Sequence, residues 1–333
     1  MFGDPARDLP QGFAFLLMPE FSMMPVTAAI EPLRIANRLA EKQLYTWQMY
    51  SVDGEAVAAS NGFTLACSGN LECVDEHAIV IICGGINVQS HTRKPMINFL
   101  RKAARRGSDI GSLCTASHVL AAAGLLDDHT CTIHWENMPA FSEDFPEIRV
   151  TGSLFEIDRD RFTCAGGTAP IDMMLALIAS QHGPELAADI AEQVLHSPIR
   201  HHSEHQRMSL PARIGARHPK LVGIIEQMEE NLEEPLSPSI LAKQAGLSTR
   251  QLERLFRRYL DRSPKRYYLE LRLKKARLLL LQTNMSVINV ALACGFSSPS
   301  HFSKCYRAFY GRTPYRERGI PTVDGELGQS QVS

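Results

Sequence analysis

The sequence predicts a doubly wound α/β domain followed by an all-α domain with two helix–turn–helix motifs. Two observations carry this prediction. Over residues 12–195, short apolar runs alternate with longer amphipathic runs, a pattern typical of a largely parallel sheet covered by helices on both faces. From residue 241 onward, one segment recurs at a spacing of about 50 residues, which indicates a duplicated supersecondary unit. A chain of 333 residues is also long enough to form two hydrophobic cores.

The α/β region is expected to form a flavodoxin-like, doubly wound sheet. Its expected strands cover residues 12–18, 45–54, 78–85, 109–114 and 161–167, and its expected helices cover residues 24–40, 96–107, 115–126, 168–183 and 184–195. Ligands of such sheets bind outside the carboxyl ends of the strands. Gly84, Gly85 and Cys114 stand at two such ends, so we expect them to line one pocket.

The charges of the chain are unevenly distributed. The formal net charge is −1, yet residues 218–318 hold 18 Lys and Arg against 9 Asp and Glu, and the remainder holds 17 against 27. A basic module favours a polyanion such as nucleic acid, whereas a merely solvated surface is the alternative. No apolar run reaches the ~20 residues that a membrane span needs, and the start of the chain does not read as a signal peptide. The eight cysteines contain no CxxC pair, which favours reduced thiols in a cytoplasmic protein without a metal or cofactor.

Each copy of the repeat is predicted to be a helix–turn–helix. Gly246 and Gly295 supply the positive φ that a tight interhelical turn requires. Ser248 and Gln251 have the spacing of a capping box, and Ser298 precedes a proline, as an N-cap residue does before a proline at the first helical position. Residues four apart on each second helix should face the core, namely Leu252, Phe256, Phe302 and Tyr306. Arg250, Gln251 and Arg254 should then point outward in the first copy, as should Ser300, His301 and Lys304 in the second.

A continuous helix over residues 265–283 should join the two copies, with an apolar stripe of Leu269, Leu273, Ala276 and Leu280. The stretches LAKQAGLSTRQLERLF, SPKRYYLELRLKKARLLL and SVINVALACGFSSPSHFSKCYRAFYGRTPYRER resemble the AraC/XylS-type DNA-binding domain. That resemblance implies two helices in successive major grooves, about 34 Å apart. It assigns DNA contacts to Arg250, Glu253, Arg254, Ser300, His301 and Lys304, and the outward-facing Gln251 is added to this set. Glu253 has the alternative of pairing with Arg257, and Asp261 departs from the glycine usual in the family, which Gly311 keeps in the second copy.

The N-terminal region resembles the ThiJ/PfpI type of the class I glutamine amidotransferase-like fold. The matching stretches are VIICGG, GSLCTASHVLAAAGLLDDHTCTIHW and FTCAGGTAPIDMMLALI. Together with the C-terminal module, the whole chain resembles a GlxA-type transcriptional regulator. In hydrolytic relatives a cysteine at the elbow between strand and helix is activated by a histidine, and backbone amides hold the oxyanion. Cys114, His134 and the Gly84 and Gly85 amides occupy the matching positions.

This sequence differs from its hydrolytic relatives in two respects, and both argue against catalytic turnover by Cys114. Thr115 and Ala116 follow the cysteine where relatives often have glycine, and the loop PEFSMMP after the first strand lacks an acidic residue at the matching place. Three interpretations of Cys114 are therefore open: it is a nucleophile, a pocket residue that contacts ligand without reacting, or a packed core residue. We expect a non-enzymatic ligand site formed by Gly84, Gly85, Cys114, Thr115, His134 and Trp135, with a thiol-dependent amidase or glyoxalase-like enzyme as the alternative.

The predicted organisation is a sensing domain over 10–195, a linker over 196–217, a DNA-binding domain over 218–318 and a flexible tail over 319–333. Within the linker, His196, His201, His202 and His205 could bind a metal, but a solvated linker is the favoured interpretation. The expected function is a cytoplasmic bacterial transcription factor that activates catabolic genes in response to a small nitrogenous metabolite, an amino acid or a betaine-like molecule. Its expected partners are promoter DNA, the effector, RNA polymerase and a second copy of the chain, with no membrane.

Overall fold

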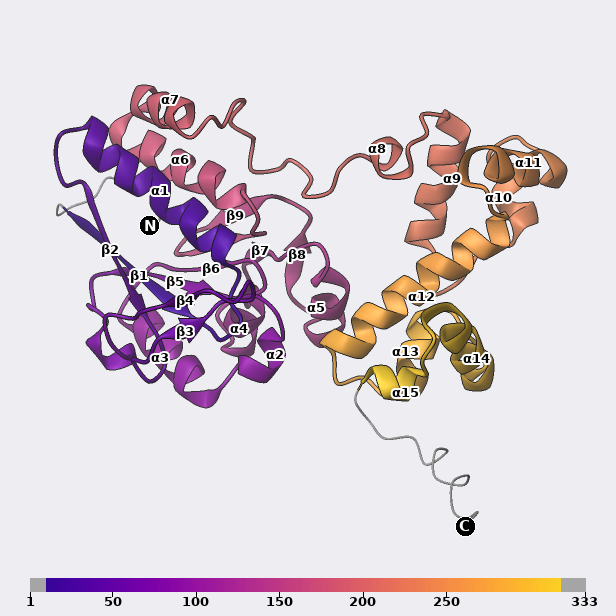
Figure 1. The fold of residues 1–333 in the computed structure, drawn as a ribbon, viewed down its shortest axis with the longest axis horizontal. Helices are drawn as coiled ribbons and strands as arrows, with labels where there is room; N and C mark the ends of the chain where they lie inside the picture. Colours follow the sequence, from indigo (N-terminus) through magenta and orange to yellow (C-terminus); the bar gives the residue numbers. More distant parts are fainter. Residues whose placement is uncertain (1–9, 319–333) are drawn as a thin grey trace, which may run out of the picture. The chain divides into compact units, whose positions relative to one another are not determined.

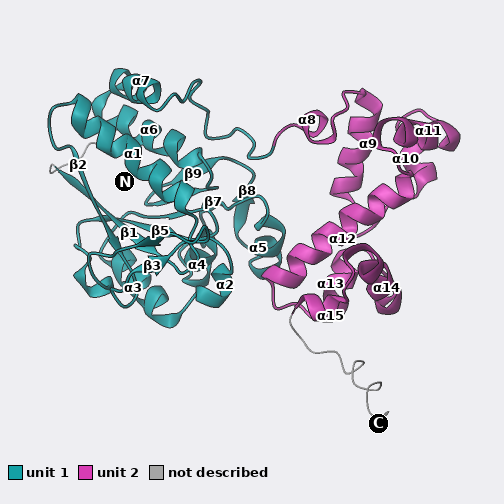
Figure 2. Ribbon diagram, viewed as in Figure 1, with its two compact units in different colours: residues 1–207 teal, residues 208–333 magenta. Residues whose placement is uncertain are grey.

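The computed structural model describes residues 10–318 and divides the chain into two units, Met1–Arg207 and Met208–Ser333 (Figure 2). The predicted tail over 319–333 lies outside the described residues. The division falls after Arg207, whereas the sequence predicts that the sensing domain ends at residue 195. The difference arises because side chains of His196, Arg200 and Gln206 form hydrogen bonds with the α/β unit.

The α/β unit contains a six-stranded sheet in the order β2-β1-β5-β6-β10-β9 (Figure 1). Its strands are β1 (Gln11–Leu17), β2 (Tyr45–Tyr50), β5 (Ile79–Cys83), β6 (Ile110–Leu113), β9 (Phe155–Asp158) and β10 (Arg161–Cys164). Every neighbouring pair is parallel except β10 and β9. This arrangement confirms the predicted doubly wound, largely parallel sheet.

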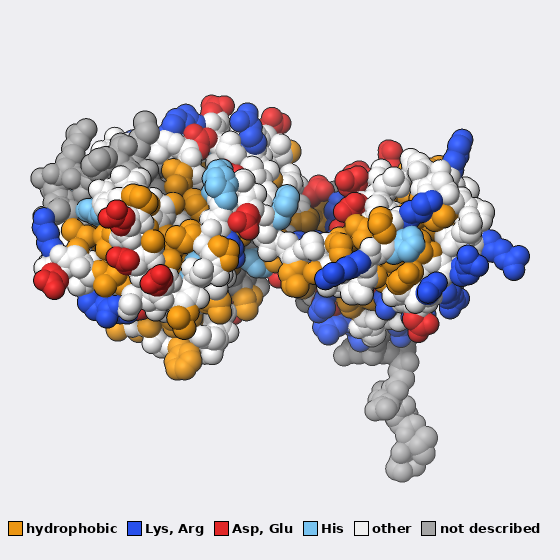
Figure 3. Space-filling model, turned by 90° about the horizontal axis from the view of Figure 1, so that it is seen from above, with side chains coloured by type: hydrophobic (Ala, Val, Ile, Leu, Met, Phe, Trp, Pro, Cys, Tyr) orange, Lys and Arg blue, Asp and Glu red, His pale blue; other side chains and the backbone are white. Residues whose placement is uncertain are grey.

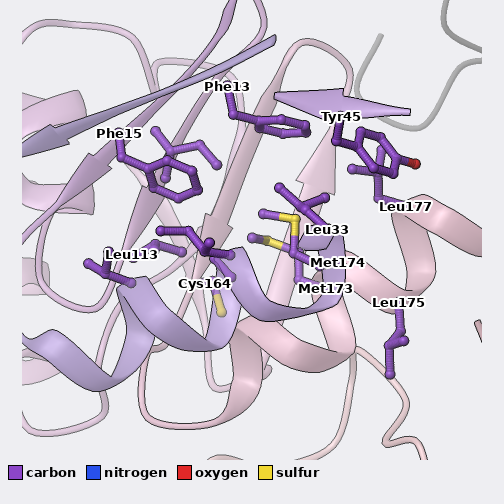
Figure 4. Packing of buried hydrophobic residues seen from close by; sticks show 14 of the residues in the cluster. Phe13, Phe15, Leu33, Tyr45, Leu113, Cys164, Met173, Met174, Leu175 and Leu177 are labelled. Atoms are coloured by element: carbon purple, nitrogen blue, oxygen red, sulfur yellow. The ribbon is translucent and has the colours of Figure 1, made fainter. Parts of the chain in front are cut away.

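Alternate side chains of the strands supply two separate cores. Phe13, Phe15 and Leu17 of β1 point into a cluster with the helices α1 (Met23–Leu39), α6 (Ala169–His182) and α7 (Pro184–Gln193) (Figure 4). Ala14 and Leu16 point to the other face, which α3 (Lys94–Arg105) and α4 (Ser117–Ala122) cover. Because successive side chains of a strand face opposite sides, a fully apolar strand must be buried on both faces.

Several short elements have no counterpart in the sequence-based prediction. They are β3 (Val57–Ala58), β4 (Thr64–Leu65), β7 (Thr130–Thr132), β8 (Arg149–Thr151), a 3₁₀ turn at Leu71–Cys73, α2 (Val88–His91) and α5 (Met138–Asp144). The antiparallel strand β9 was also not predicted. Periodicity is hard to detect in two to seven residues, and the short strands form because distant segments pair with them.

The helical unit consists of α8 (Leu210–Ile214), α9 (Pro219–Glu230), α10 (Pro238–Gln244), α11 (Thr249–Leu260), α12 (Pro264–Gln282), α13 (Val287–Ala293), α14 (Pro299–Tyr310) and α15 (Pro314–Glu317). Helices α10 and α11 form the first helix–turn–helix, and α13 and α14 form the second (Figure 1). The 19-residue helix α12 joins the two motifs without a break, as predicted. Of its expected stripe, Leu273, Ala276 and Leu280 are buried and Leu269 is half-buried.

The turns have the predicted conformations. Gly246 and Gly295 adopt φ values of +61° and +74°. The capping box is present: the side chain of Ser248 accepts from the Gln251 amide at 3.2 Å, and the Ser248 amide donates to Gln251 Oε1 at 2.7 Å. In the second copy Ser298 accepts from the amide of His301.

Candidate functional site

The second helices of the two motifs are amphipathic in the predicted sense. Leu252 and Phe256 of α11, like Phe302 and Tyr306 of α14, are 0% exposed. The opposite faces carry the predicted DNA-contacting side chains. Arg250, Gln251, Arg254, Ser300, His301 and Lys304 are exposed, and Glu253 is half-buried. Each helix therefore buries its apolar stripe and presents a polar, basic face.

Two of these side chains already have partners within the domain. Gln251 Oε1 accepts the Ser248 amide in the capping box, so its carbonyl oxygen is engaged at the helix N-terminus. The Nε2 atom of His301 lies 3.4 Å from the Sγ atom of Cys305. The guanidinium groups on α11 and the ammonium of Lys304 are the strongest donors that face outward. Arginine and lysine are the residue types that pair with guanine edges and phosphates.

Further basic residues extend these faces beyond the positions that the resemblance singled out. Arg257 and Arg258 on α11 and Arg307 on α14 are exposed. Arg254 and Arg258 line a hollow of about 540 Å³ beside α11, and Lys304 and Arg307 line one of about 550 Å³ beside α14. Figure 3 shows Lys and Arg side chains gathered over the helical unit. The charge count predicted the excess of cations, but only the helix positions show which of them share a face.

Two side chains of helix α12 hold the second motif in place by donating hydrogen bonds to its backbone carbonyls. Arg272 donates from Nε to the Cys294 carbonyl at 2.7 Å and from Nη2 to the Gly295 carbonyl at 2.6 Å, and its guanidinium lies 4.1 Å from the ring centre of Phe296. Lys275 reaches the Ala293 carbonyl at 3.2 Å. Cations at a helix C-terminus satisfy its last carbonyls and its dipole. The orientation of the second motif on α12 is therefore fixed by charge-assisted hydrogen bonds as well as by packing.

Cys114 forms an elbow between β6 and α4. Its φ is +63°, a left-handed value that is rare outside glycine. The amide of Cys114 donates to the Cys164 carbonyl at 2.9 Å, which ties the elbow to the end of β10. A Cβ atom at Gly166 would lie 2.9 Å from the Cβ of Cys114, so only glycine fits beside the elbow.

The glycine pair after β5 touches the elbow, as expected. A Cβ atom at Gly84 would lie 2.7 Å from Oγ1 of Thr115, and this hydroxyl donates to the Gly85 carbonyl at 2.8 Å. The amide of His134 donates to the Cys114 carbonyl at 3.1 Å. Trp135 follows with 38% of its surface exposed and its ring centre 5.6 Å from that of His134. The structure thus brings together the predicted ligand residues at the carboxyl ends of the strands.

The two acidic residues near the first loop have partners elsewhere. Glu20 has a φ of +59°, and its Oε2 lies 2.9 Å from Asn87 Nδ2 and 3.1 Å from His91 Nε2. The Asn87 bond, followed by the His91 bond, lowers the pKa of Glu20. Glu31 pairs with Arg34 at 2.6 Å.

Residues 196–207 are mostly exposed, as expected of a solvated segment, but the side chains of His196, Arg200 and Gln206 anchor them to the α/β unit. Asp172 on α6 is 1% exposed, and its carboxylate lies 2.7 Å from His196 Nε2 and 2.6 Å from Arg200 Nη2. A buried carboxylate without partners is costly, so the chain supplies two. Within residues 10–318 no group of three or more His, Cys, Asp and Glu side chains could hold a metal ion.

Comparison with known proteins identifies both units. Residues 14–180 match the DJ-1/PfpI family, and residues 241–319 match a helix-turn-helix domain. The chain is 46% identical over 329 residues to the HTH-type transcriptional regulator GbdR of Pseudomonas aeruginosa, covering 98% of this chain and 88% of the relative. It is 39% identical over 306 residues to the HTH-type transcriptional regulator GlxA of Rhizobium meliloti, covering 91% and 94%. The chain belongs to this family of transcriptional regulators.

A solved structure supports the same assignment. The crystal structure of an AraC family transcriptional regulator from Pseudomonas putida superposes with a TM-score of 0.51 at 29% identity, and it covers 56% of this chain and 100% of that chain. The protein is thus an AraC-type regulator with a DJ-1/PfpI sensor domain, as the resemblances predicted. No helix among residues 10–318 is both long and apolar enough to cross a membrane.

The chemistry of the elbow agrees with a regulator rather than an enzyme. Burial raises the pKa of the Cys114 thiol to about 11, with Glu136 adding to the rise and the Thr115 amide opposing it. Burial also lowers the pKa of His134. Nucleophilic cysteines commonly have a depressed pKa, whereas burial shifts the pKa of the Cys114 thiol in the opposite direction. The matching relatives are HTH-type transcriptional regulators, which supports a regulator rather than the thiol-dependent hydrolase.

Proposed function

We propose that this regulator binds promoter DNA through α11 and α14 and adjusts the transcription of catabolic genes when its sensor domain binds a small nitrogenous metabolite. The observation that carries the proposal is the duplicated pair of capped, basic helices joined by the unbroken helix α12. Two such helices can enter successive major grooves of B-DNA. The effector would be an amino acid or a betaine-like molecule.

In this proposal the exposed side chains of the two helices divide the recognition of DNA. Arg254 and Lys304 occupy equivalent positions on α11 and α14 and are both exposed, so we assign them to base edges or adjacent phosphates. Arg250, Gln251, Glu253, Ser300 and His301 complete the two faces. Gln251 would contact DNA through its amide nitrogen, because its oxygen serves the capping box.

The effector site in this proposal consists of Gly84, Gly85, Cys114, Thr115, His134 and Trp135. Their contacts with one another at the carboxyl ends of β5 and β6 support this choice, since ligands of doubly wound sheets bind at such ends. Cys114 would contact the ligand as a neutral thiol. The ligand can change transcription only through a different affinity for two states of the regulator.

The proposal includes a homodimer in the bacterial cytoplasm that activates genes through RNA polymerase. The test uses the full chain. Genomic fragments selected by the purified protein would be assayed by fluorescence anisotropy with and without a panel of amino acids, betaines and polyamines. We expect one specific promoter fragment whose affinity changes with one nitrogenous compound. Binding that does not discriminate between selected and random DNA would refute the proposed function.

A further inference from the structure

Each helix–turn–helix is preceded by a helix that belongs to the same duplicated unit. Lys220 in α9 and Arg272 in α12 are each followed by buried residues at the first, fourth and eighth positions. These residues are Leu221, Ile224 and Met228 in α9, and Leu273, Ala276 and Leu280 in α12. Equal spacing from the buried stripe puts Lys220 and Arg272 at equivalent places on their helices. The repeat therefore contains three helices, and the first of them carries a cation at a fixed position.

The two cations bind the same atom of their motifs. Lys220 Nζ donates to the Gly246 carbonyl at 3.3 Å, and Arg272 Nη2 donates to the Gly295 carbonyl at 2.6 Å. Both glycines are the turn residues with a positive φ. The recognition helices α11 and α14 begin shortly after these turns, and in a helix–turn–helix the first residues of the recognition helix face the base edges. A cation that holds the turn carbonyl therefore also holds the start of the recognition helix.

The cation of the second motif is attached more firmly than that of the first. Arg272 is half-buried, donates also from Nε to the Cys294 carbonyl at 2.7 Å, and lies 4.1 Å from the ring centre of Phe296. Lys220 is exposed. Arginine presents a planar fork of donors that fits two acceptors, whereas lysine is a flexible point charge. The second turn is therefore fixed by two charge-assisted hydrogen bonds and a cation–π contact, and the first by a longer bond from a solvated side chain.

The surroundings of the two turns differ in the same direction. A Cβ atom on Gly295 would lie 2.6 Å from the Leu232 carbonyl oxygen, whereas on Gly246 the nearest atom would be Lys220 Nζ at 3.8 Å. The residue after Gly295, Phe296, is 2% exposed, and its counterpart Leu247 is only half-buried. The second turn is thus packed against backbone as well as bound by Arg272. The first turn is open, and Lys220 is its nearest support.

We propose that Lys220 and Arg272 are positioning residues that set how strictly each recognition helix discriminates between bases. Arg272 holds α14 in one orientation, and the weaker hold of Lys220 lets α11 adjust. This inference rests on the proposed function and adds to it that the two halves of the operator are recognised with different stringency. A helix fixed by its supporting contacts loses the full energy of a contact at a wrong base. A helix that shifts recovers part of that energy, so it discriminates less.

The test uses the full-length protein and the promoter fragment that it selects, with each base changed singly. Two helices in successive grooves should give two blocks of discriminating bases about one helical turn apart. Arg272→Lys keeps the charge but loses the planar fork, so discrimination in one block should fall about 5-fold while the other block stays unchanged. The salt dependence of binding should stay the same, because no phosphate contact is removed. Lys274→Gln, at an exposed cation of the same helix, should leave discrimination in both blocks unchanged.

The first motif supplies the converse variant, which does not depend on the stability of the second. Lys220→Arg introduces the fork that Arg272 already provides, so discrimination in the other block should rise about 2- to 3-fold. Hydrogen exchange without DNA gives an independent readout. In the parent protein the amides of Gly246 and Leu247 should exchange about 10-fold faster than those of Gly295 and Phe296, after correction for intrinsic rates. Arg272→Lys and Lys220→Arg should each reduce this difference, from opposite sides.

The outcomes separate this inference from the proposed function. Discrimination that falls in both blocks, or in neither, in Arg272→Lys would overturn the positioning role of Arg272. A change in Lys220→Arg that is equal on all sequences would identify Lys220 as a phosphate contact and overturn its role. A parent protein that does not distinguish selected from random DNA would instead refute the proposed function, and hydrogen exchange would still decide whether the two turns are held differently.

Discussion

Asp261 and Gly311 end the equivalent helices α11 and α14 in the same left-handed conformation, with φ values of +52° and +74°. Each residue donates its amide to the carbonyl of the arginine four positions earlier. The departure from glycine at position 261 therefore leaves the shape of the first loop unchanged. The backbone of Asp261 is strained, because the left-handed region is disfavoured for L-residues. Aspartate tolerates this region better than most other residues do.

The strain at this helix end predicts a stabilising substitution. Asp261→Gly should raise the free energy of opening of the first helix–turn–helix by about 0.5–1 kcal/mol, since glycine adopts a positive φ without a steric cost. Hydrogen exchange of peptides from α11 and α12 measures this locally. The reverse change, Gly311→Asp, should destabilise α14 by a similar amount. Faster exchange in Asp261→Gly would contradict the strain argument.

The two turn glycines should respond differently to the same substitution. Both have a positive φ, so alanine costs about 1 kcal/mol at either site. At Gly295 the new Cβ would also lie 2.6 Å from the Leu232 carbonyl oxygen, whereas at Gly246 the nearest atom is the end of the Lys220 side chain at 3.8 Å. We expect Gly295→Ala to lose about 2 kcal/mol more than Gly246→Ala, because backbone cannot move aside as a flexible side chain can. Hydrogen exchange of peptides from α13 and α10 measures the stability lost in each variant. Equal losses of stability in the two variants would be inconsistent with the clash at Gly295.

Promoter binding should depend on Arg254 and Lys304. Alanine at either position should weaken specific binding by about 1–3 kcal/mol if the side chain reads bases. The measurement is fluorescence anisotropy on the selected promoter and on random DNA at several salt concentrations. Lys102→Ala on the sensor helix α3, an exposed cation, is the matched control and should bind as the parent protein does. Losses of equal size on both DNAs would restrict the two residues to phosphate contacts.

The elbow thiol should behave as a buried neutral group. Because burial raises the pKa of Cys114 from 9.0 to about 11, the folded form holds its proton at pH values where the unfolded chain loses it. The contribution of the group to stability is therefore fully present below pH 9 and is lost as the pH rises through about 11. Iodoacetamide should modify Cys114 far more slowly at pH 7 than it modifies the exposed Cys73, which mass spectrometry resolves.

A matched variant tests whether reactivity matters to sensing. Cys114→Ser should keep the response of the promoter to its effector, because a neutral thiol contributes contact rather than chemistry. It should also show a shallower loss of stability above pH 9, as measured by urea unfolding at a series of pH values. Thiol-dependent ester or amide hydrolysis by the parent protein that is absent from Cys114→Ser would contradict the hypothesis that Cys114 contacts the ligand without reacting.

The buried carboxylate on α6 should be essential to the stability of the sensor unit. Asp172→Asn removes the charge that His196 and Arg200 share, and breaking a buried pair from one side costs about 3–5 kcal/mol. Urea unfolding followed by the fluorescence of Trp47 and Trp135 reports this unit alone, since both tryptophans lie in it. Asp189→Asn on the exposed face of α7 should change the free energy of unfolding by less than about 0.5 kcal/mol.

Much of the architecture could be predicted from local patterns. The apolar strands, the capping box at Ser248, the turn glycines and the unbroken helix over 264–282 all follow from neighbours in sequence. The short strands β7, β8 and β9 could not be predicted in this way, because they exist only through pairing with distant segments. The outward faces of α11 and α14 were predictable since helical spacing alone determines them.

The sequence by itself determined the two units, their order, the duplicated helix–turn–helix and the residues that meet at the elbow, because short-range periodicity and strand ends encode these features. Only the tertiary structure decided that residues 196–207 belong to the sensor unit. In the sequence, a run rich in histidine and arginine indicates a solvated segment. Only the structure shows that His196 and Arg200 bind the buried carboxylate of Asp172. Electrostatic partners are chosen by proximity in space, and a single sequence does not record that proximity.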